Sequence, residues 1–476
     1  MPSLPSITKL ESLIPLDMAE RSNFHLVIPA SNPDPNLCKA VVSASILGYP
    51  APLIINWNQT FDDPNLVEGG SHLAKIKGMA EYFESMSQSH DEDIVLIMDG
   101  YDAWIQLRPQ TMVDRFYSIN EQADKRIETE LGKQTMKSNN VSQQVIFGCQ
   151  KRCWPWTFDD PPCYAVPQSS LPKDIYGNDT DTDVGDEENP YIKYRQRFLN
   201  SGVAAGTVQG LRKLFQQAYR QVPADSNFGS DQFIFSHIFG DQELYREILR
   251  RDSGLPPNEN FNAAHIEEVR AKAAAHPDGN FEFGIGVDYA SEIGLNTVFA
   301  EDDTDWVNFA DSEQLRRVQD DRGIPAESHR LGPIAMDIGN STPPFATSEP
   351  LDKSEHLPSS NWEHVRLFTD VYTGVAPVVI HHNAHRNGMK SLRETWWPLI
   401  WFQKYIRTLL RTAGDVSDRP IAVKQAKGEW RREYWAMESD KMADRRGVFA
   451  KDASTGNWLS FEDLCGAYED EIFRDA

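Results

Sequence analysis

Blocks of apolar residues alternate with polar segments in the first part of the chain, and the spacing within each block predicts the element that it forms. Residues 24–31, 51–57 and 94–98 are apolar runs, typical of strands that are covered on both faces. Residues 36–49 and 72–86 carry apolar side chains at the spacing of a helix. Strands that alternate with helices predict an α/β fold with a doubly wound, mainly parallel sheet.

The pattern of strands and helices continues further along, with one long interruption. Residues 144–155 predict a strand, 198–219 a strand followed by a helix, and 230–239 a helix. Residues 300–362 are acidic and rich in proline and serine, with little periodicity. Because such a composition offers few apolar side chains to a core, we expect an insertion or a mobile loop there.

The C-terminal part of the chain differs in character from the rest. Residues 391–411 combine aromatic and aliphatic side chains at helical spacing and predict an amphipathic helix. Burial of this helix against the sheet is favoured, and attachment to a membrane surface or to a partner is the alternative. We expect one domain over residues 20–395, interrupted by the acidic segment, and a helical C-terminal extension over residues 396–476.

Charge and composition limit the partners of this fold. The chain of 476 residues has 47 Lys and Arg against 71 Asp and Glu, a formal charge of -24, which argues against nucleic acid and anionic membranes. An anionic ligand would have to be held locally, by a metal ion or by a few basic side chains. There is no signal-peptide pattern and no run of about 18 apolar residues, so we expect no membrane span. The compartment stays open, because a place in the secretory pathway would require a longer natural precursor.

The cysteines do not form a recognisable framework. The chain has five cysteines: Cys38, Cys149, Cys153, Cys163 and Cys465. Five are too few for a disulfide scaffold, and their spacings match no zinc-binding pattern. Cys153 and Cys163 can pair in an oxidising compartment.

Two carboxylates follow the buried strand predicted at residues 94–98. Asp99 and Asp102 lie where that strand ends, at the edge at which doubly wound sheets bind ligands. Two carboxylates on such a turn suit Mg²⁺ or Mn²⁺, which can neutralise a diphosphate. Tyr101, between them, can stack on a base or a sugar. An ordinary turn in an acidic chain explains the same residues, and both interpretations stay open.

Histidines follow the last predicted strand, at His381, His382 and His385. One imidazole added to two carboxylates completes a protein half-shell for Mn²⁺ and leaves positions for phosphate oxygens. Arg386 and Lys390, close by in sequence, can cover phosphate charge. Exposed surface positions are the ordinary alternative for all these side chains.

Two further short motifs have structural interpretations that suffice by themselves and do not exclude a role at a sugar. In the sequence FLNSG, Asn200, Ser201 and Gly202 let a backbone approach a sugar and offer directed hydrogen bonds, or they form a plain turn. In the sequence SDQFIF, Ser230 is expected to cap a helix, with Asp231 in its first turn, where the helix dipole stabilises a carboxylate.

The order of six motifs carries a resemblance that none of them carries alone. The sequences IMDGYDAW, VIFGCQKRCWP, FLNSGVAAG, SDQFIF, FGIGVDYASEIG and PVVIHHN resemble the glycosyltransferase domain of procollagen lysyl hydroxylases and its fungal relatives, over residues 24–390. The resemblance implies a GT-A fold, a Rossmann-like mixed sheet flanked by helices. It also implies a metal-dependent enzyme that moves a hexose from UDP-glucose or UDP-galactose to a hydroxyl acceptor, with Mn²⁺ or Mg²⁺ as the cofactor.

The resemblance also assigns roles to individual residues. Asp99, Asp102 and His381 match the metal ligands of the family, and Tyr101 matches its uridine-stacking tyrosine. Asn200 and Asp231 would position the sugar, with Asp231 near the anomeric carbon. The remaining expected donor contacts are Lys75, Ser201, Gly202, Asn383 and Lys390.

The chain departs from the family at two positions, which concern the acceptor side and the diphosphate. Gln150 stands where the family has a carboxylate, and His382 stands where it has a glycine. Two alternatives to a transferase therefore stay open: a metal-dependent hydrolase with the same ligands, and a degenerate, non-catalytic protein that binds a nucleotide sugar. We find no facial triad of metal ligands in the remaining residues and do not predict lysine hydroxylation.

Overall fold

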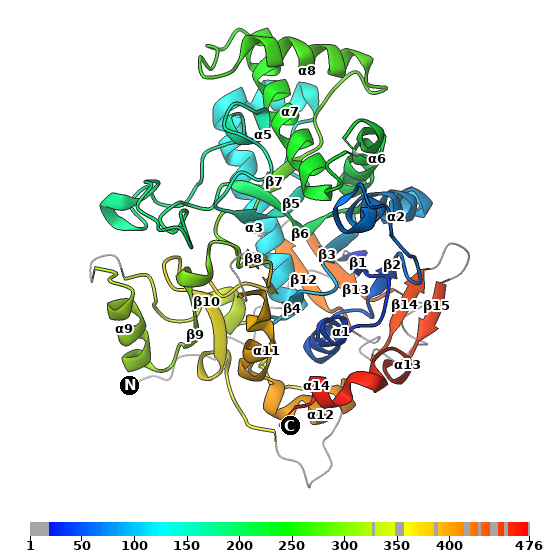
Figure 1. Cartoon of the computed structure of the whole chain (residues 1–476), viewed down its shortest axis with the longest axis vertical. Coiled ribbons are helices and arrows are strands. Elements are labelled where there is room, and N and C mark those ends of the chain that lie inside the picture. The colour runs from blue at the N-terminus through cyan, green and yellow to red at the C-terminus, as the bar shows by residue number, and fades with distance from the viewer. Residues whose placement is uncertain are drawn as a thin grey trace.

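A mixed sheet lies at the centre of the molecule in the computed structural model (Figure 1). The structure describes residues 19–225, 227–325, 329–347, 357–384, 389–413, 419–426, 430–437, 446–451 and 456–474. The described strands of this sheet are β1 (Ala19–Pro29), β2 (Leu53–Ile55), β3 (Ile94–Met98), β4 (Ala103–Ile105), β5 (Val145–Gln150), β6 (Phe198–Thr207), β7 (Ile285–Val287), β8 (Gly294–Asn296), β11 (Val379–His381), β12 (Ala422–Ala426), β13 (Trp430–Trp435), β14 (Val448–Lys451) and β15 (Gly456–Leu459).

The strand order is β15-β14-β2-β1-β3-β6-β5-β8-β11-β4, with β13 beside β1, β12 beside β13, and β7 beside β5. Most neighbours run parallel, but β6 is antiparallel to both β3 and β5, and β4 is antiparallel to β11. The prediction of an α/β fold with a largely parallel sheet is confirmed.

Helices cover both faces of the sheet. Those described are α1 (Pro35–Leu47), α2 (Ser71–Ser85), α3 (Pro109–Leu131), α4 (Lys133–Asn139), α5 (Pro161–Tyr164), α6 (Val208–Asp225), α7 (Asp231–Asp252), α8 (Ala263–Ala275), α9 (Ser312–Asp321), α10 (Met336–Gly339), α11 (Leu392–Trp396), α12 (Ile406–Arg411), α13 (Phe461–Cys465) and α14 (Glu469–Ile472). No described helix is long and apolar enough to span a membrane.

Alternate side chains of β1 pack into two separate hydrophobic cores, one on each face of the sheet. Phe24, Leu26 and Ile28 pack in the core beneath α1 and the C-terminal helices, whereas Val27 packs in the core beneath α2, α6 and α7. Successive side chains of a strand point to opposite faces, so an apolar run without alternation marks a strand buried on both sides.

The acidic segment at residues 300–362 is more ordered than expected. Its described parts contain β9 (Thr304–Asn308), which pairs with β10 (Arg366–Asp370) in a second, two-stranded sheet, and also α9 and α10. A small core, with Val307, Leu315 and Val371 among its members, holds β9, α9 and the turn after β10 together. These parts, for which we expected an insertion or a mobile loop, are ordered because widely spaced apolar side chains meet after folding. Residues 326–328 and 348–356 lie outside the described residues.

The aromatic segment at residues 391–411 is buried, as expected, but is not one helix. It comprises α11, a 3₁₀ turn η9 (Trp397–Leu399), a second 3₁₀ turn η10 (Gln403–Tyr405) and α12. Pro398 lies in η9, where its missing N–H breaks the helical hydrogen bonds. Trp397 and Phe402 are fully buried in the core under α1.

The C-terminal extension is not simply helical, which corrects the prediction for residues 396–476. Four described strands, β12 to β15, lie there, and Figure 1 shows β14 and β15 at the end of the sheet beyond β2. β13 runs parallel to β1 and β14 runs parallel to β2. A disulfide between Cys38 of α1 and Cys465 of α13 ties this part to the rest of the fold.

The other cysteines agree with the sequence analysis. Cys153, in the loop that follows β5, forms a disulfide with Cys163 of α5. Cys149 lies on β5 as a buried free thiol.

Candidate active site

All eleven residues selected from the sequence line one cavity of about 320 Å³: Lys75, Asp99, Tyr101, Asp102, Asn200, Ser201, Gly202, Asp231, His381, Asn383 and Lys390. They come from the ends of β3 and β11 and the turns that follow them, and from the first half of β6. The others lie in the second turn of α2, the first turn of α7 and the 3₁₀ turn η8 (Met389–Ser391). The volume lies within the range of about 300–1,000 Å³ that is typical of small-molecule pockets. Segments far apart in sequence thus meet in one place.

Asp99, Asp102 and His381 form a cluster of possible metal ligands. The His381 Nε2 atom lies 3.6 Å from Asp99 Oδ2 and 3.4 Å from Asp102 Oδ1. The strand register brings these residues together, because His381 of β11 pairs with Ala103 of β4, next to Asp102. Two carboxylates and one imidazole are a donor set that suits Mn²⁺ or Mg²⁺.

The Nδ1 atom of His381, which faces away from the aspartates, carries a hydrogen. His381 Nδ1 lies 2.7 Å from Asn296 Oδ1, which can only accept, so Nδ1 donates this hydrogen bond. The buried Nε2 atom has no hydrogen-bond partner among the described residues. A partner on the second nitrogen is the usual way in which proteins prepare an imidazole to bind a metal ion. The residues present therefore fit a divalent cation.

Asp102 remains charged despite its burial. Burial alone would raise the pKa of its carboxyl, but the neighbouring His381 and Lys390 outweigh that effect and hold the pKa well below its usual range. The Lys390 ammonium lies 3.1 Å from Asp102 Oδ2 and is half exposed. A carboxylate that is already ionised can bind a cation without losing a proton.

His382 is not part of this cluster. Its ring lies 4.1 Å from that of Trp104, between centroids, and it does not line the cavity. Burial lowers the pKa of His382 to about 3, so the imidazole is neutral. The His382 side chain therefore packs in the core under α1 and does not obstruct the cavity. His385 and Arg386 lie outside the described residues.

Lys75 joins two carboxylates at one wall of the cavity. Its Nζ atom lies 2.8 Å from Asp99 Oδ1 and 3.0 Å from Asp231 Oδ2, and it donates to the Ser201 carbonyl. Burial alone would lower the pKa of Lys75, but Asp231 and Asp99 outweigh it and raise the pKa above the usual range. The lysine is thus a permanent cation that links α2 to β3, β6 and α7.

The hydroxyl of Tyr101 is fixed by the loop that follows β1. It accepts hydrogen bonds from the Ser31 and Asn32 backbone N–H groups, at 2.8 and 3.0 Å, and donates to the Asn32 carbonyl. Because the hydroxyl is held at this loop, the ring forms part of the cavity wall in one orientation. A fixed aromatic ring can stack on a flat heterocycle at little cost in conformational entropy.

Asn200 is oriented by Gln150. The Asn200 Nδ2 atom donates to Gln150 Oε1 at 2.8 Å, and Asn200 Oδ1 accepts from the Gly202 N–H at 3.0 Å. Gln150 Nε2 donates in turn to the Arg152 carbonyl. The Gln150 amide therefore supports the β6 side of the cavity.

The sequence analysis missed several residues that the structure brings to the cavity. Asn296, which orients His381, ends the short strand β8, and an asparagine at a strand end was the available signal. His72 lies one turn before Lys75 on α2, and its Nδ1 atom is 3.8 Å from Asp231 Oδ1. The other lining residues that were missed are Asn56, Phe61, Glu68, Trp154 and Gln232.

Comparison with known proteins does not identify the function of this cavity. No model of a known protein family matches the chain, and a search of curated proteins finds no match. The function must be inferred from the site itself.

Proposed function

We propose that this protein is a metal-dependent glycosyltransferase with a GT-A-type fold, which transfers a hexose from a UDP-sugar to a hydroxyl acceptor. The observation that carries the proposal is the buried Nε2 of His381, which has no hydrogen-bond partner among the described residues and faces Asp99 and Asp102 inside the cavity. The ordered motifs that resemble the transferase domain of procollagen lysyl hydroxylases support the same choice.

The protein residues have separate tasks in this proposal. Asp99, Asp102 and His381 would hold Mn²⁺ or Mg²⁺. Such an ion, when bound, neutralises the diphosphate and stabilises the charge that develops on the leaving UDP. Tyr101 stacks on the uracil ring, while Lys390, half exposed beside Asp102, adds positive charge at the diphosphate. Asn383, Ser201 and Gly202 line the wall on which the donor lies.

The reacting carbon is expected near Asp231. During transfer, the bond between the anomeric carbon and the UDP oxygen breaks, a bond to the acceptor oxygen forms, and the acceptor hydroxyl loses its proton. Positive charge accumulates on the sugar ring in the transition state. Burial would raise the pKa of Asp231, but Lys75 and His72 outweigh it and lower the pKa, so its carboxylate is available to stabilise that charge. Asn200 positions the sugar hydroxyls.

The experiment that tests this function measures UDP release with Mn²⁺ and, in turn, UDP-glucose, UDP-galactose, UDP-N-acetylglucosamine and UDP-glucuronate. We expect release from one donor, and a loss of at least ~100-fold on Asp99→Asn or Asp102→Asn. Asp159→Asn, which changes an exposed aspartate outside the cavity, is the matched control and should retain activity.

Two results would favour the alternatives. Metal-dependent hydrolysis of phosphate esters without preference for a uridine nucleotide would indicate a hydrolase. A thermal shift with UDP and Mn²⁺ but no turnover of any donor would indicate a non-catalytic binding protein. Full activity of Asp99→Asn would refute the assignment of the metal ligands.

A further inference from the structure

A second cluster of nitrogen and oxygen ligands lies away from the cavity, at the opposite end of β3. His25 of β1, His90 of the 3₁₀ turn η3 (Gln88–His90) and Asp93, directly before β3, each place one ligand atom within 4.8 Å of the others. Asp99 follows the C-terminal end of the same strand. The two clusters are therefore separated by the full length of β3 and do not share a residue.

The distances in this cluster are close to those of a metal site. The Asp93 Oδ2 atom lies 3.0 Å from His25 Nε2 and 2.8 Å from His90 Nδ1. Ligand atoms of a tetrahedral Zn²⁺ site, with bonds of about 2.0–2.1 Å, are about 3.3 Å apart. The two pairs of carboxylate oxygen and ring nitrogen have to open by only a few tenths of an ångström to admit the ion.

The surroundings already orient two of the three ligands. Asp93 Oδ1 accepts the Asn23 backbone N–H at 2.7 Å, and Oδ2 faces both imidazoles while also accepting from the Asn23 Nδ2 atom at 3.1 Å. The Tyr82 hydroxyl lies 3.3 Å from His25 Nδ1. Contacts of this kind, a backbone donor on the carboxylate and a hydroxyl on the far nitrogen of the histidine, are typical of the surroundings of zinc ligands.

Metal binding requires the ring nitrogens that face Asp93 to be free of protons. Without an ion, His25 Nε2 and His90 Nδ1 can each donate a hydrogen to Asp93 Oδ2. With an ion, the proton of His25 moves to Nδ1, where the Tyr82 hydroxyl can accept it, and the proton of His90 moves to Nε2. The side chain of His90 is 33% exposed, so water can reach its ring and supply a fourth ligand. His25 and Asp93 are buried.

We propose that His25, His90 and Asp93 bind a structural Zn²⁺ ion that fastens the turn before β3 to β1. The donor set separates this site from the cavity: two imidazoles and one carboxylate favour zinc, whereas two carboxylates and one imidazole suit Mn²⁺ or Mg²⁺. The ion would stabilise the folded chain, because the unfolded chain does not hold these three ligands together.

The test measures zinc bound to the chelator-treated, full-length protein after equilibrium dialysis, together with thermal unfolding with and without Zn²⁺. His90→Gln is the diagnostic variant, since glutamine can still donate to Asp93 but is a poor zinc ligand. His364→Gln removes an exposed histidine elsewhere as the matched control, and Asp99→Asn disables the cavity cluster. Circular dichroism of metal-free His90→Gln checks that it folds.

We expect wild type, His364→Gln and Asp99→Asn each to bind one zinc ion and His90→Gln to bind none. Zinc should raise the unfolding temperature of the first three proteins and not that of His90→Gln. Co²⁺ in place of zinc should give the visible absorption of a four-coordinate ion, which His90→Gln lacks. Equal zinc content and equal thermal shift in His90→Gln and His364→Gln would overturn the proposal, as would the absence of bound zinc in all four proteins.

Discussion

Gly202 lies directly against the imidazole of His381: a Cβ atom added to Gly202 would lie 2.0 Å from His381 Cε1. No side chain fits at position 202 while His381 keeps its place. Gly202 was expected to be a donor contact, and the structure adds that it makes room for the imidazole of His381, the proposed metal ligand. We therefore expect Gly202→Ala to displace His381 and to weaken Mn²⁺ binding by at least ~10-fold.

Calorimetric titration with Mn²⁺ checks this prediction. Gly132→Ala is the control for replacing a glycine without a steric clash. A Cβ atom added to Gly132 would meet no atom within 4 Å, although the φ angle of Gly132 is positive at 76°. Unchanged metal affinity in Gly202→Ala would show that His381 does not bind the ion.

The candidate site could be predicted from the sequence because its residues lie where predicted strands and helices end. An apolar run that stops at Met98 places Asp99 and Asp102 at the sheet edge, and a second run places His381 there. Which of His381 and His382 reaches the cavity depends on the side of the sheet to which each side chain points. That side is set by pairing with β4 and β8, which the local sequence does not reveal.

The C-terminal strands could not be predicted in the same way. β12 has the sequence AVKQA and β13 has WRREYW, with charged residues that fit a helix or a loop equally well. They become strands because β13 pairs with the exposed edge at the start of β1 and β14 pairs with β2. Strand formation here depends on tertiary partners, and so does the Cys38–Cys465 disulfide, whose cysteines are separated by 427 positions.

Tyr101→Ala should weaken donor binding more than Tyr101→Phe. Stacking of a base on an aromatic ring contributes about 1–3 kcal/mol, so the alanine variant should raise the KM for the UDP-sugar by ~10-fold or more. Phenylalanine keeps the ring and loses only the hydroxyl contacts to Ser31 and Asn32, so its effect should be smaller. Steady-state kinetics with the preferred donor measure both, and equal KM values for the two variants would contradict a stacking role.

Removal of the Cys38–Cys465 disulfide should loosen the C-terminal part of the fold. A double replacement by alanine is expected to lower the free energy of unfolding by about 2–5 kcal/mol. Hydrogen exchange should rise in β14, β15 and α13, since the disulfide holds α13 against α1. The corresponding replacement of Cys153 and Cys163 is the control and should leave exchange in β14 and β15 at the wild-type rate. Equal exchange in all three proteins would show that packing alone holds the C-terminal strands.

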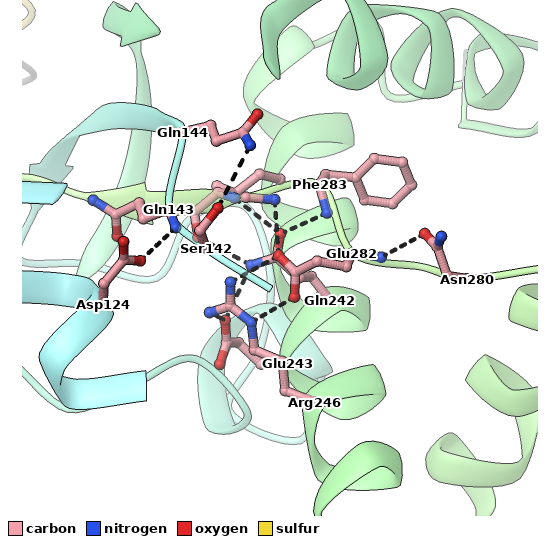
Figure 2. Close-up of polar contacts among 12 residues, drawn as sticks. Asp124, Ser142, Gln143, Gln144, Gln242, Glu243, Arg246, Asn280, Glu282 and Phe283 are labelled. Atoms are coloured by element: carbon pink, nitrogen blue, oxygen red, sulfur yellow. Dashed lines mark hydrogen bonds and ion pairs between the residues drawn. The ribbon is translucent and has the colours of Figure 1, made fainter. Parts of the chain in front are cut away.

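Glu243 should make the free energy of unfolding depend on pH, because it shares the Arg246 guanidinium with a second carboxylate, that of Glu282. Arg246 forms two hydrogen bonds of 2.8 Å to Glu282 and one of 2.8 Å to Glu243, as Figure 2 shows. Burial, reinforced by Glu282 and only partly offset by Arg246, raises the pKa of Glu243 from its usual 4.5 to about 7. Between these two pH values the folded protein holds a proton that the unfolded chain has lost, so the stability from this group falls as pH rises.

Glu243→Gln should remove this dependence. The free energy of unfolding of wild type should fall from pH 5 to pH 8 by up to ~3 kcal/mol more than that of the variant. Glu292 and Asp370, whose pKa values burial also raises to about 7, contribute the same slope to both proteins and cancel in the difference. Urea unfolding at pH 5, 6, 7 and 8 measures the effect, with Glu267→Gln, an exposed partner of Arg270, as the control. Parallel pH curves for wild type and Glu243→Gln would show that Glu243 is already ionised in the folded protein at pH 5.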